Sequence, residues 1–175
     1  MRHLHPLLAL FLAAVLAACG GGGDSRPGDQ TLKNKFSGQV TFGDSLADVG
    51  TYAVGPIAAA GGGKFTINGN NVTVNPALTG ATWSELMAAQ LGLPAPCAAQ
   101  TGLDGDPAQG FSVPVVNHPG CFGYAQGGAR VTNPVGPRNK QTGSPLGQLT
   151  VPVVTQIANH LAVAGGRYGS EGNTK

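Results

Sequence analysis

The chain has 175 residues with a formal net charge of +2, and only 10% of the residues are charged. Its ten lysines and arginines are scattered without a basic run, which argues against a nucleic-acid partner. Glycine (29) and proline (13) are abundant, which predicts short elements joined by turns within one domain.

The N-terminus has the pattern of a secretory signal peptide. Arg2 precedes an apolar run over residues 7–18 that ends in small residues. The run is too short to span a bilayer comfortably, and glycines follow it. We therefore predict that residues 1–18 form a signal peptide rather than a transmembrane helix.

The end of this run, Leu16-Ala17-Ala18-Cys19, resembles the bacterial lipobox. The resemblance implies cleavage before Cys19 and attachment of several acyl chains to this cysteine, which gives lasting membrane anchorage. Gly20 in place of Asp implies the outer membrane, facing the periplasm or the cell surface. The alternative is an ordinary signal peptide followed by an incidental cysteine. Residues 19–35 are Gly-rich and polar, which predicts a flexible tether.

The domain is expected to begin with a strand at residues 38–42, where apolar and polar side chains alternate. Gly43 permits a sharp turn after it, which would place Ser45 at the start of a following helix. The free N–H groups of a helix N-terminus favour an oxyanion. By itself, a Gly-Asp-Ser turn with Asp44 as a helix cap is equally a common structural feature.

Further elements are predicted along the chain. Residues 65–67 and 72–74 alternate around a turn-rich segment and indicate a small hairpin. Thr82 and Glu85 form a capping-box pattern for a helix ending near residue 92, with Trp83 and Met87 expected in the core.

Pro152 is expected to open a second helix, with an apolar stripe of Val154, Ile157, Ala158 and Leu161. Residues 93–148, between the two helices, predict long loops around one or two short strands.

Two segments carry the chemistry. Residues 42–50 read Phe-Gly-Asp-Ser-Leu-Ala-Asp-Val-Gly and resemble the first block of the GDSL (SGNH) esterase family at every fixed position. Residues 123–130, Gly-Tyr-Ala-Gln-Gly-Gly-Ala-Arg, resemble the second block, although Gly123 stands where the family commonly has Asn. The resemblance implies that Ser45 is the nucleophile and an oxyanion N–H donor, that Gly128 gives a second N–H, and that Asp44 has a supporting role.

The resemblance also implies a three-layer α/β/α fold with a mostly parallel sheet over residues 36–175. The family's Gly-x-Asn-Asp and Asp-x-x-His blocks do not occur, so we expect a fold that is incomplete at the C-terminus and a chain with little turnover. His118 and His160 are the only histidines after the leader, and a structural role is expected for both.

The implied reaction is hydrolysis of carboxylic esters or lipids through an acyl-enzyme, without a metal or an organic cofactor. The alternative function is a non-catalytic lipoprotein that binds a ligand in the same cleft. Phosphate binding by the glycine runs at 20–23 or 61–63 is disfavoured, because both lack the Lys-Ser/Thr of a P-loop.

Two cysteines, Cys97 and Cys121, remain after Cys19. Export would bring them into an oxidising compartment, where they can pair with each other. Two buried thiols are the alternative.

Overall fold

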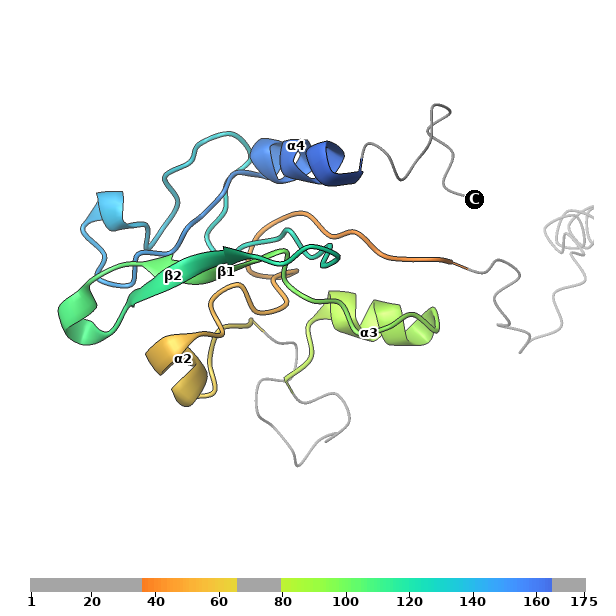
Figure 1. Cartoon of the computed structure of the whole chain (residues 1–175), viewed down its shortest axis with the longest axis horizontal. Helices are drawn as coiled ribbons and strands as arrows, with labels where there is room; N and C mark the ends of the chain where they lie inside the picture. The colour runs from red at the N-terminus through yellow and green to blue at the C-terminus, as the bar shows by residue number, and fades with distance from the viewer. Residues whose placement is uncertain (1–35, 66–79, 165–175) are drawn as a thin grey trace, which may run out of the picture. The chain divides into compact units, whose positions relative to one another are not determined.

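The computed structural model of the protein describes residues 36–65 and 80–164 (Figure 1). The predicted signal peptide, the Cys19 anchor, the tether and most of the hairpin expected at residues 65–74 lie outside these ranges. Within the described ranges, no helix combines the length and the apolar character needed to cross a membrane.

Secondary structure in the described residues is sparse. The described residues form three helices, α2 (Gly55–Ala59), α3 (Trp83–Gln90) and α4 (Val153–Ala164), which are labelled in Figure 1. Strands β1 (Gln100–Asp104) and β2 (Ser112–Asn117) form one antiparallel two-stranded sheet. Two 3-10 turns complete the set, η2 (Pro107–Gln109) and η3 (Lys140–Thr142).

The expected three-layer fold with a mostly parallel sheet is wrong. Across residues 36–65 and 80–164 there is no parallel sheet, and parallel pairing is limited to two isolated bridges, Thr41↔Gly123 and Ala98↔Gly123. Prolines precede Ala98, and Gly120 and Gly127 flank the segment at Gly123, so neither bridge extends into a ladder. The strand expected at 38–42 is reduced to the single bridge residue Thr41.

The helix expected after Ser45 is also absent from the described chain, which forms a turn at residues 45–47 and starts its first helix at Gly55. The Asp48 carboxylate accepts hydrogen bonds from the N–H groups of Gly50 (2.9 Å) and Thr51 (2.7 Å). These bonds turn the backbone after a single turn and compete with helix continuation. Any oxyanion stabilisation must therefore come from individual N–H groups and not from a helix dipole.

Helix α3 begins as predicted but buries a different face. The capping box is confirmed, because Glu85 N donates to Thr82 Oγ1 (3.4 Å) and Thr82 N donates to Glu85 Oε2 (2.7 Å). Its core positions are Ser84 and Ala88, whereas Trp83 and Met87, expected in the core, are 40% and 41% exposed. Small side chains let the helix backbone approach closely, as the bond from Ser84 Oγ to the carbonyl of Ala47 (3.4 Å) indicates.

Helix α4 follows Pro152 as predicted, and its apolar stripe faces outward. Val154, Ile157 and Leu161 are exposed, while Gln156 and His160 are 1% and 5% exposed. Position 156 is drawn inward by hydrogen bonds to the main chain. The His160 ring packs edge-on against three aromatic rings, those of Phe42, Phe122 and Tyr124.

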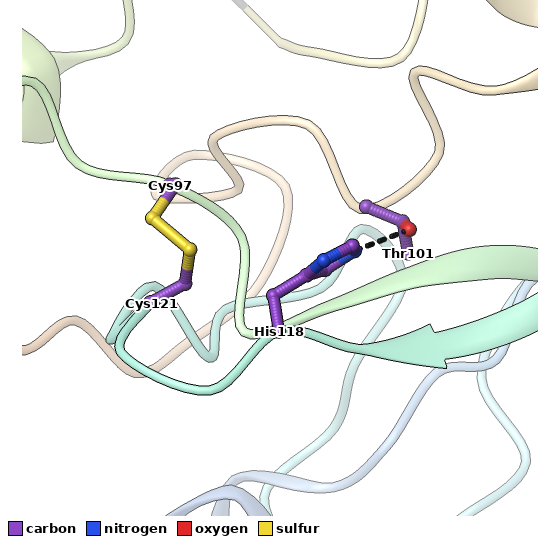
Figure 2. The surroundings of a disulfide bond; sticks show 4 residues. All are labelled: Cys97, Thr101, His118 and Cys121. Carbon is purple, nitrogen blue, oxygen red and sulfur yellow. Dashed lines mark hydrogen bonds between the residues drawn. A yellow bond between two sulfur atoms is a disulfide. The ribbon is translucent and has the colours of Figure 1, made fainter.

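Cys97 and Cys121 form a disulfide that closes a loop around the β1–β2 hairpin (Figure 2). Within this loop His118 Nε2 lies 2.8 Å from Thr101 Oγ1, which joins the start of β1 to the residue after β2. The covalent bond and the side-chain bond together fix the two ends of the hairpin relative to each other.

Candidate functional site

Ser45 lies at the wall of a cavity of about 200 Å³. The side chain is half-buried, and within the described residues neither its hydroxyl nor its N–H has a hydrogen-bond partner. Residues from distant parts of the chain also line this cavity. They include Asp48, Tyr52, Lys64, Gly127 and Arg138. The fold thus presents the serine to a small, half-open pocket.

The turn that carries Ser45 is held by a glutamine from α4. Gln156 Oε1 accepts the N–H of Gly43 (2.9 Å), and its Nε2 donates to the Gly43 carbonyl (2.9 Å) and to the Val151 carbonyl (2.8 Å). Gly43 has φ of +137°, a conformation that favours glycine. The buried amide therefore fixes the strained residue two positions before the serine.

Asp48 joins the serine turn to the second family-like segment. Besides the N–H groups of Gly50 and Thr51, its carboxylate accepts the N–H of Gly127 (2.8 Å). Gln126 N also donates to the Gly43 carbonyl (3.1 Å). Burial raises the pKa of Asp48, and its backbone hydrogen bonds oppose this shift.

The Gly127-Gly128 pair lies beside this junction, and Gly127 rather than Gly128 lines the cavity. Gly128 has φ of +79°, and a Cβ there would meet the carbonyl oxygen of Pro137 at 2.8 Å. The requirement for glycine thus comes from the protein's own loop, not from approach to a substrate. Among the described residues nothing accepts the N–H of Gly128, whereas that of Gly127 is bound by Asp48.

A buried phenol fixes the same loop from the other side. Tyr52 Oη donates to the Gly127 carbonyl (3.0 Å) and accepts the N–H of Thr150 (3.1 Å). Burial raises the pKa of Tyr52, so the phenol stays protonated and keeps its donor role.

Gly123, the departure from the family pattern, is explained by close packing. It is buried, donates to the Cys97 carbonyl (3.0 Å), and accepts from Ala99 N (2.8 Å). A Cβ at this position would lie 2.7 Å from Val49 Cγ2 and 2.8 Å from the Cys97 oxygen. An asparagine does not fit here without a shift of the chain.

The charged groups near Ser45 are few. Lys64 pairs with Glu85 (2.8 Å), and Arg138, which has φ of +64°, lines the cavity with an exposed side chain. Asp44 is exposed and outside the cavity lining, where Oδ1 accepts the N–H of Leu46 (3.1 Å). This contact supports the turn itself, and Asp44 has no described contact with the cavity.

Neither histidine of the described chain lines the Ser45 cavity. His160 is buried among aromatic rings, and His118 is bound to Thr101 at a different cavity. Within the same residues, no group of three His, Cys, Asp or Glu side chains could hold a metal ion. A proton acceptor for the Ser45 hydroxyl is therefore not provided by an imidazole in this part of the chain.

Sequence reasoning did not assign roles to Asp48, Tyr52, Thr150 or Gln156. Asp48 belongs to the quoted first block, so its presence was visible, but its contact with Gly127 was not. Gln156 lies outside the apolar stripe of α4, and no sequence signal connects it with Gly43, 113 residues earlier.

Comparison of the chain with protein-family models, with curated proteins and with solved structures gave no match.

Proposed function

We propose that the protein is a serine ester hydrolase of the GDSL type that acts through Ser45. The observation that carries the proposal is the joining of the two family-like segments at one place, by the bonds from Gly127 N to Asp48 and from Gln126 N to Gly43. Ser45 and Gly128 each lie two residues from the Gly43–Gln126 bond. Their N–H groups have no acceptor among the described residues, which suits two donors to an oxyanion, although only Ser45 lines the cavity and Gly128 would have to turn its N–H toward it.

In the proposed reaction, the Ser45 oxygen attacks the ester carbonyl carbon while its proton passes to a base. The carbonyl oxygen becomes negative and accepts hydrogen bonds from the N–H groups of Ser45 and Gly128. The tetrahedral intermediate then collapses, the C–O bond to the alcohol breaks, and the alcohol leaves with a proton. Water hydrolyses the resulting acyl-enzyme and restores the serine.

Since neither histidine lines the cavity, we expect slow acylation that an external base can accelerate. The chain is incubated with p-nitrophenyl acetate at increasing imidazole concentration, and the acetylated peptide is located by mass spectrometry. Acetylation of the Ser45 peptide is expected to rise in proportion to imidazole. Ser45→Ala should remove this adduct, while Ser37→Ala, at an exposed serine that does not line the cavity, should leave it unchanged. An oxyanion hole alone retains roughly 10³-fold catalysis over water, so the adduct is measurable.

A second function, binding without catalysis in the same cavity, is favoured by the lack of a histidine in the cavity lining. A fluorophosphonate probe distinguishes the two, because labelling requires an activated serine and binding does not. A folded chain with neither imidazole-dependent acetylation nor fluorophosphonate labelling of Ser45 would contradict the hydrolase proposal and leave binding as the better interpretation.

A further inference from the structure

We infer that a second cavity, which has no lining residue in common with the Ser45 cavity, is a binding site for a neutral sugar. It is lined by one face of α4, by the ends of β1 and β2, and by the turn at residues 118–121. Its volume is about 500 Å³, which lies within the roughly 300–1,000 Å³ of small-molecule sites. The Ser45 cavity, at about 200 Å³, is less than half as large.

The lining contains no Asp, Glu, Lys or Arg. A charged ligand entering it would lose hydration without gaining an ion pair, which is costly. The polar side chains of the lining are instead five amides, one imidazole and one phenol, those of Gln100, Asn117, Gln126, Gln156, Asn159, His118 and Tyr124. The chemistry of the walls therefore selects for an uncharged, hydrogen-bonding ligand.

The amides are ordered before a ligand arrives. Val151 N donates to Gln126 Oε1 (3.0 Å), Gln126 Nε2 to Gln100 Oε1 (3.0 Å), and Gln100 Nε2 to Asn117 Oδ1 (2.9 Å). This chain of bonds fixes which way each amide points and ends at the exposed Asn117. A site ordered in advance loses less entropy when it binds.

Two asparagines remain to contact a ligand. The side chain of Asn159 is exposed, and no described residue bonds to it; Asn117 uses Oδ1 for Gln100, and its NH₂ group has no described acceptor. An amide offers a donor and an acceptor side by side, and each sugar hydroxyl is likewise both donor and acceptor. Hydroxyl-rich ligands can therefore bond to the Asn159 amide and to the NH₂ group of Asn117.

The remaining wall suits the C–H face of a sugar ring. The Tyr124 ring lines the cavity and is held by stacking on Phe42, with ring centroids 5.6 Å apart. Pro119, Ala162 and Val163 add aliphatic surface. The Cys97–Cys121 disulfide, shown beside His118 in Figure 2, fixes the turn that carries Pro119. Ordered amides, together with an aromatic and aliphatic part of the wall, define the proposed sugar site.

The test is a titration of the chain with four neutral tetrasaccharides, built from glucose, xylose, galactose or N-acetylglucosamine, and with a galacturonate tetramer as the charged comparison. Binding is followed by the NMR signals of the side-chain amides. At least one neutral sugar is expected to shift the Asn117 and Asn159 signals and to bind at least tenfold more tightly than galacturonate.

Ala162→Trp places an indole in the cavity from an exposed position and should weaken this binding at least tenfold. Ala158→Trp is the matched control, because Ala158 is exposed on the same helix but does not line the cavity, and it should bind as the unchanged chain does. Asn159→Ala is expected to weaken binding several-fold. Absence of binding by all four neutral sugars, equal binding of galacturonate, or unchanged binding by folded Ala162→Trp and Asn159→Ala would each overturn the inference.

Discussion

Around the Ser45 turn, polar side chains are buried. On the outer faces of α3 and α4, by contrast, apolar side chains are exposed. Asp48, Gln126 and Gln156 are buried, whereas Met87 and Leu161 are 41% and 56% exposed. This difference arises because few backbone N–H and carbonyl groups of the described chain are paired in a β-sheet. Loop segments must satisfy their buried N–H and carbonyl groups with side chains, so polar residues occupy the interior. We therefore expect stability to depend more on the buried amides and carboxylate than on the apolar stripes.

The largest expected effect comes from Gln156→Leu. The substitution removes the amide, so Gly43 N and Val151 O lose their partners, while Gly43 O keeps only the bond from Gln126 N. At about 1–3 kcal/mol for each of these two unsatisfied groups, the loss is about 2–6 kcal/mol of unfolding free energy. Urea denaturation followed by circular dichroism measures it. Gln141→Leu, at an exposed glutamine of η3, is the control and should stay within about 0.5 kcal/mol. Equal stability of the two variants would contradict the expectation that the buried amides contribute more to stability than exposed side chains.

Asp48→Asn tests the carboxylate between the two segments. An amide NH₂ in place of one carboxylate oxygen would face the N–H of Gly50 and Thr51 or that of Gly127, at an expected cost of about 1–3 kcal/mol at neutral pH. Asp104→Asn is the control, because that carboxylate is exposed and pairs with Lys140 at the surface, where an ion pair contributes about 0–1 kcal/mol.

The difference in stability between the unchanged chain and Asp48→Asn should also depend on pH. Because burial raises the pKa of Asp48 above its usual 3.8, the folded chain binds this proton more tightly than the unfolded chain. The Asp48 contribution is therefore complete below pH 3.8 and decreases as pH rises through the raised pKa. The stability advantage over Asp48→Asn should be larger at acid pH than at pH 7 and level off above the pKa. An advantage that grows with pH would show that the three N–H donors outweigh burial.

The smallest effect is expected at the exposed stripe of α4. Leu161→Ala should change the free energy of unfolding by about 0.5 kcal/mol or less, since the side chain is 56% exposed. The same substitution at Leu103 of β1, which is 1% exposed, should cost about 2–5 kcal/mol. Denaturant midpoints of both variants give the comparison directly. A loss of more than about 2 kcal/mol at Leu161 would mean that the stripe is packed in the protein in solution.

The sequence predicted where the helices α3 and α4 begin better than which of their faces is buried. Local signals set the start of both helices. The capping box of Thr82 and Glu85 starts α3, and the proline at position 152 precedes α4. Which face is buried depends on distant partners, such as Gly43 for Gln156, and apolar periodicity alone assigned the wrong face. The parallel sheet, which the family resemblance implied, was wrong, because two short matching segments do not reveal how far strand pairing extends between them.

The sequence suggested two segments for the candidate site, and the roles of their residues stay predictions. The two quoted segments are joined in space, but the contacts that join them, through Asp48 and Gln156, could not be read from spacing. The structure also replaces the expected helix N-terminus at Ser45 by a turn, and it assigns the glycine requirement at 128 to packing against Pro137. These are tertiary effects, which single-sequence patterns do not encode.

The Cys97–Cys121 bond makes the β1–β2 hairpin part of a covalent ring. Cleavage of one peptide bond at the hairpin tip would therefore not divide the molecule into two pieces. The cut halves would stay attached through sulfur, with the strands still paired, and would separate only once a reductant opened the ring. A cut at the hairpin tip would thus leave the molecule in one piece in an oxidising compartment, whereas a reducing compartment would let the two parts separate.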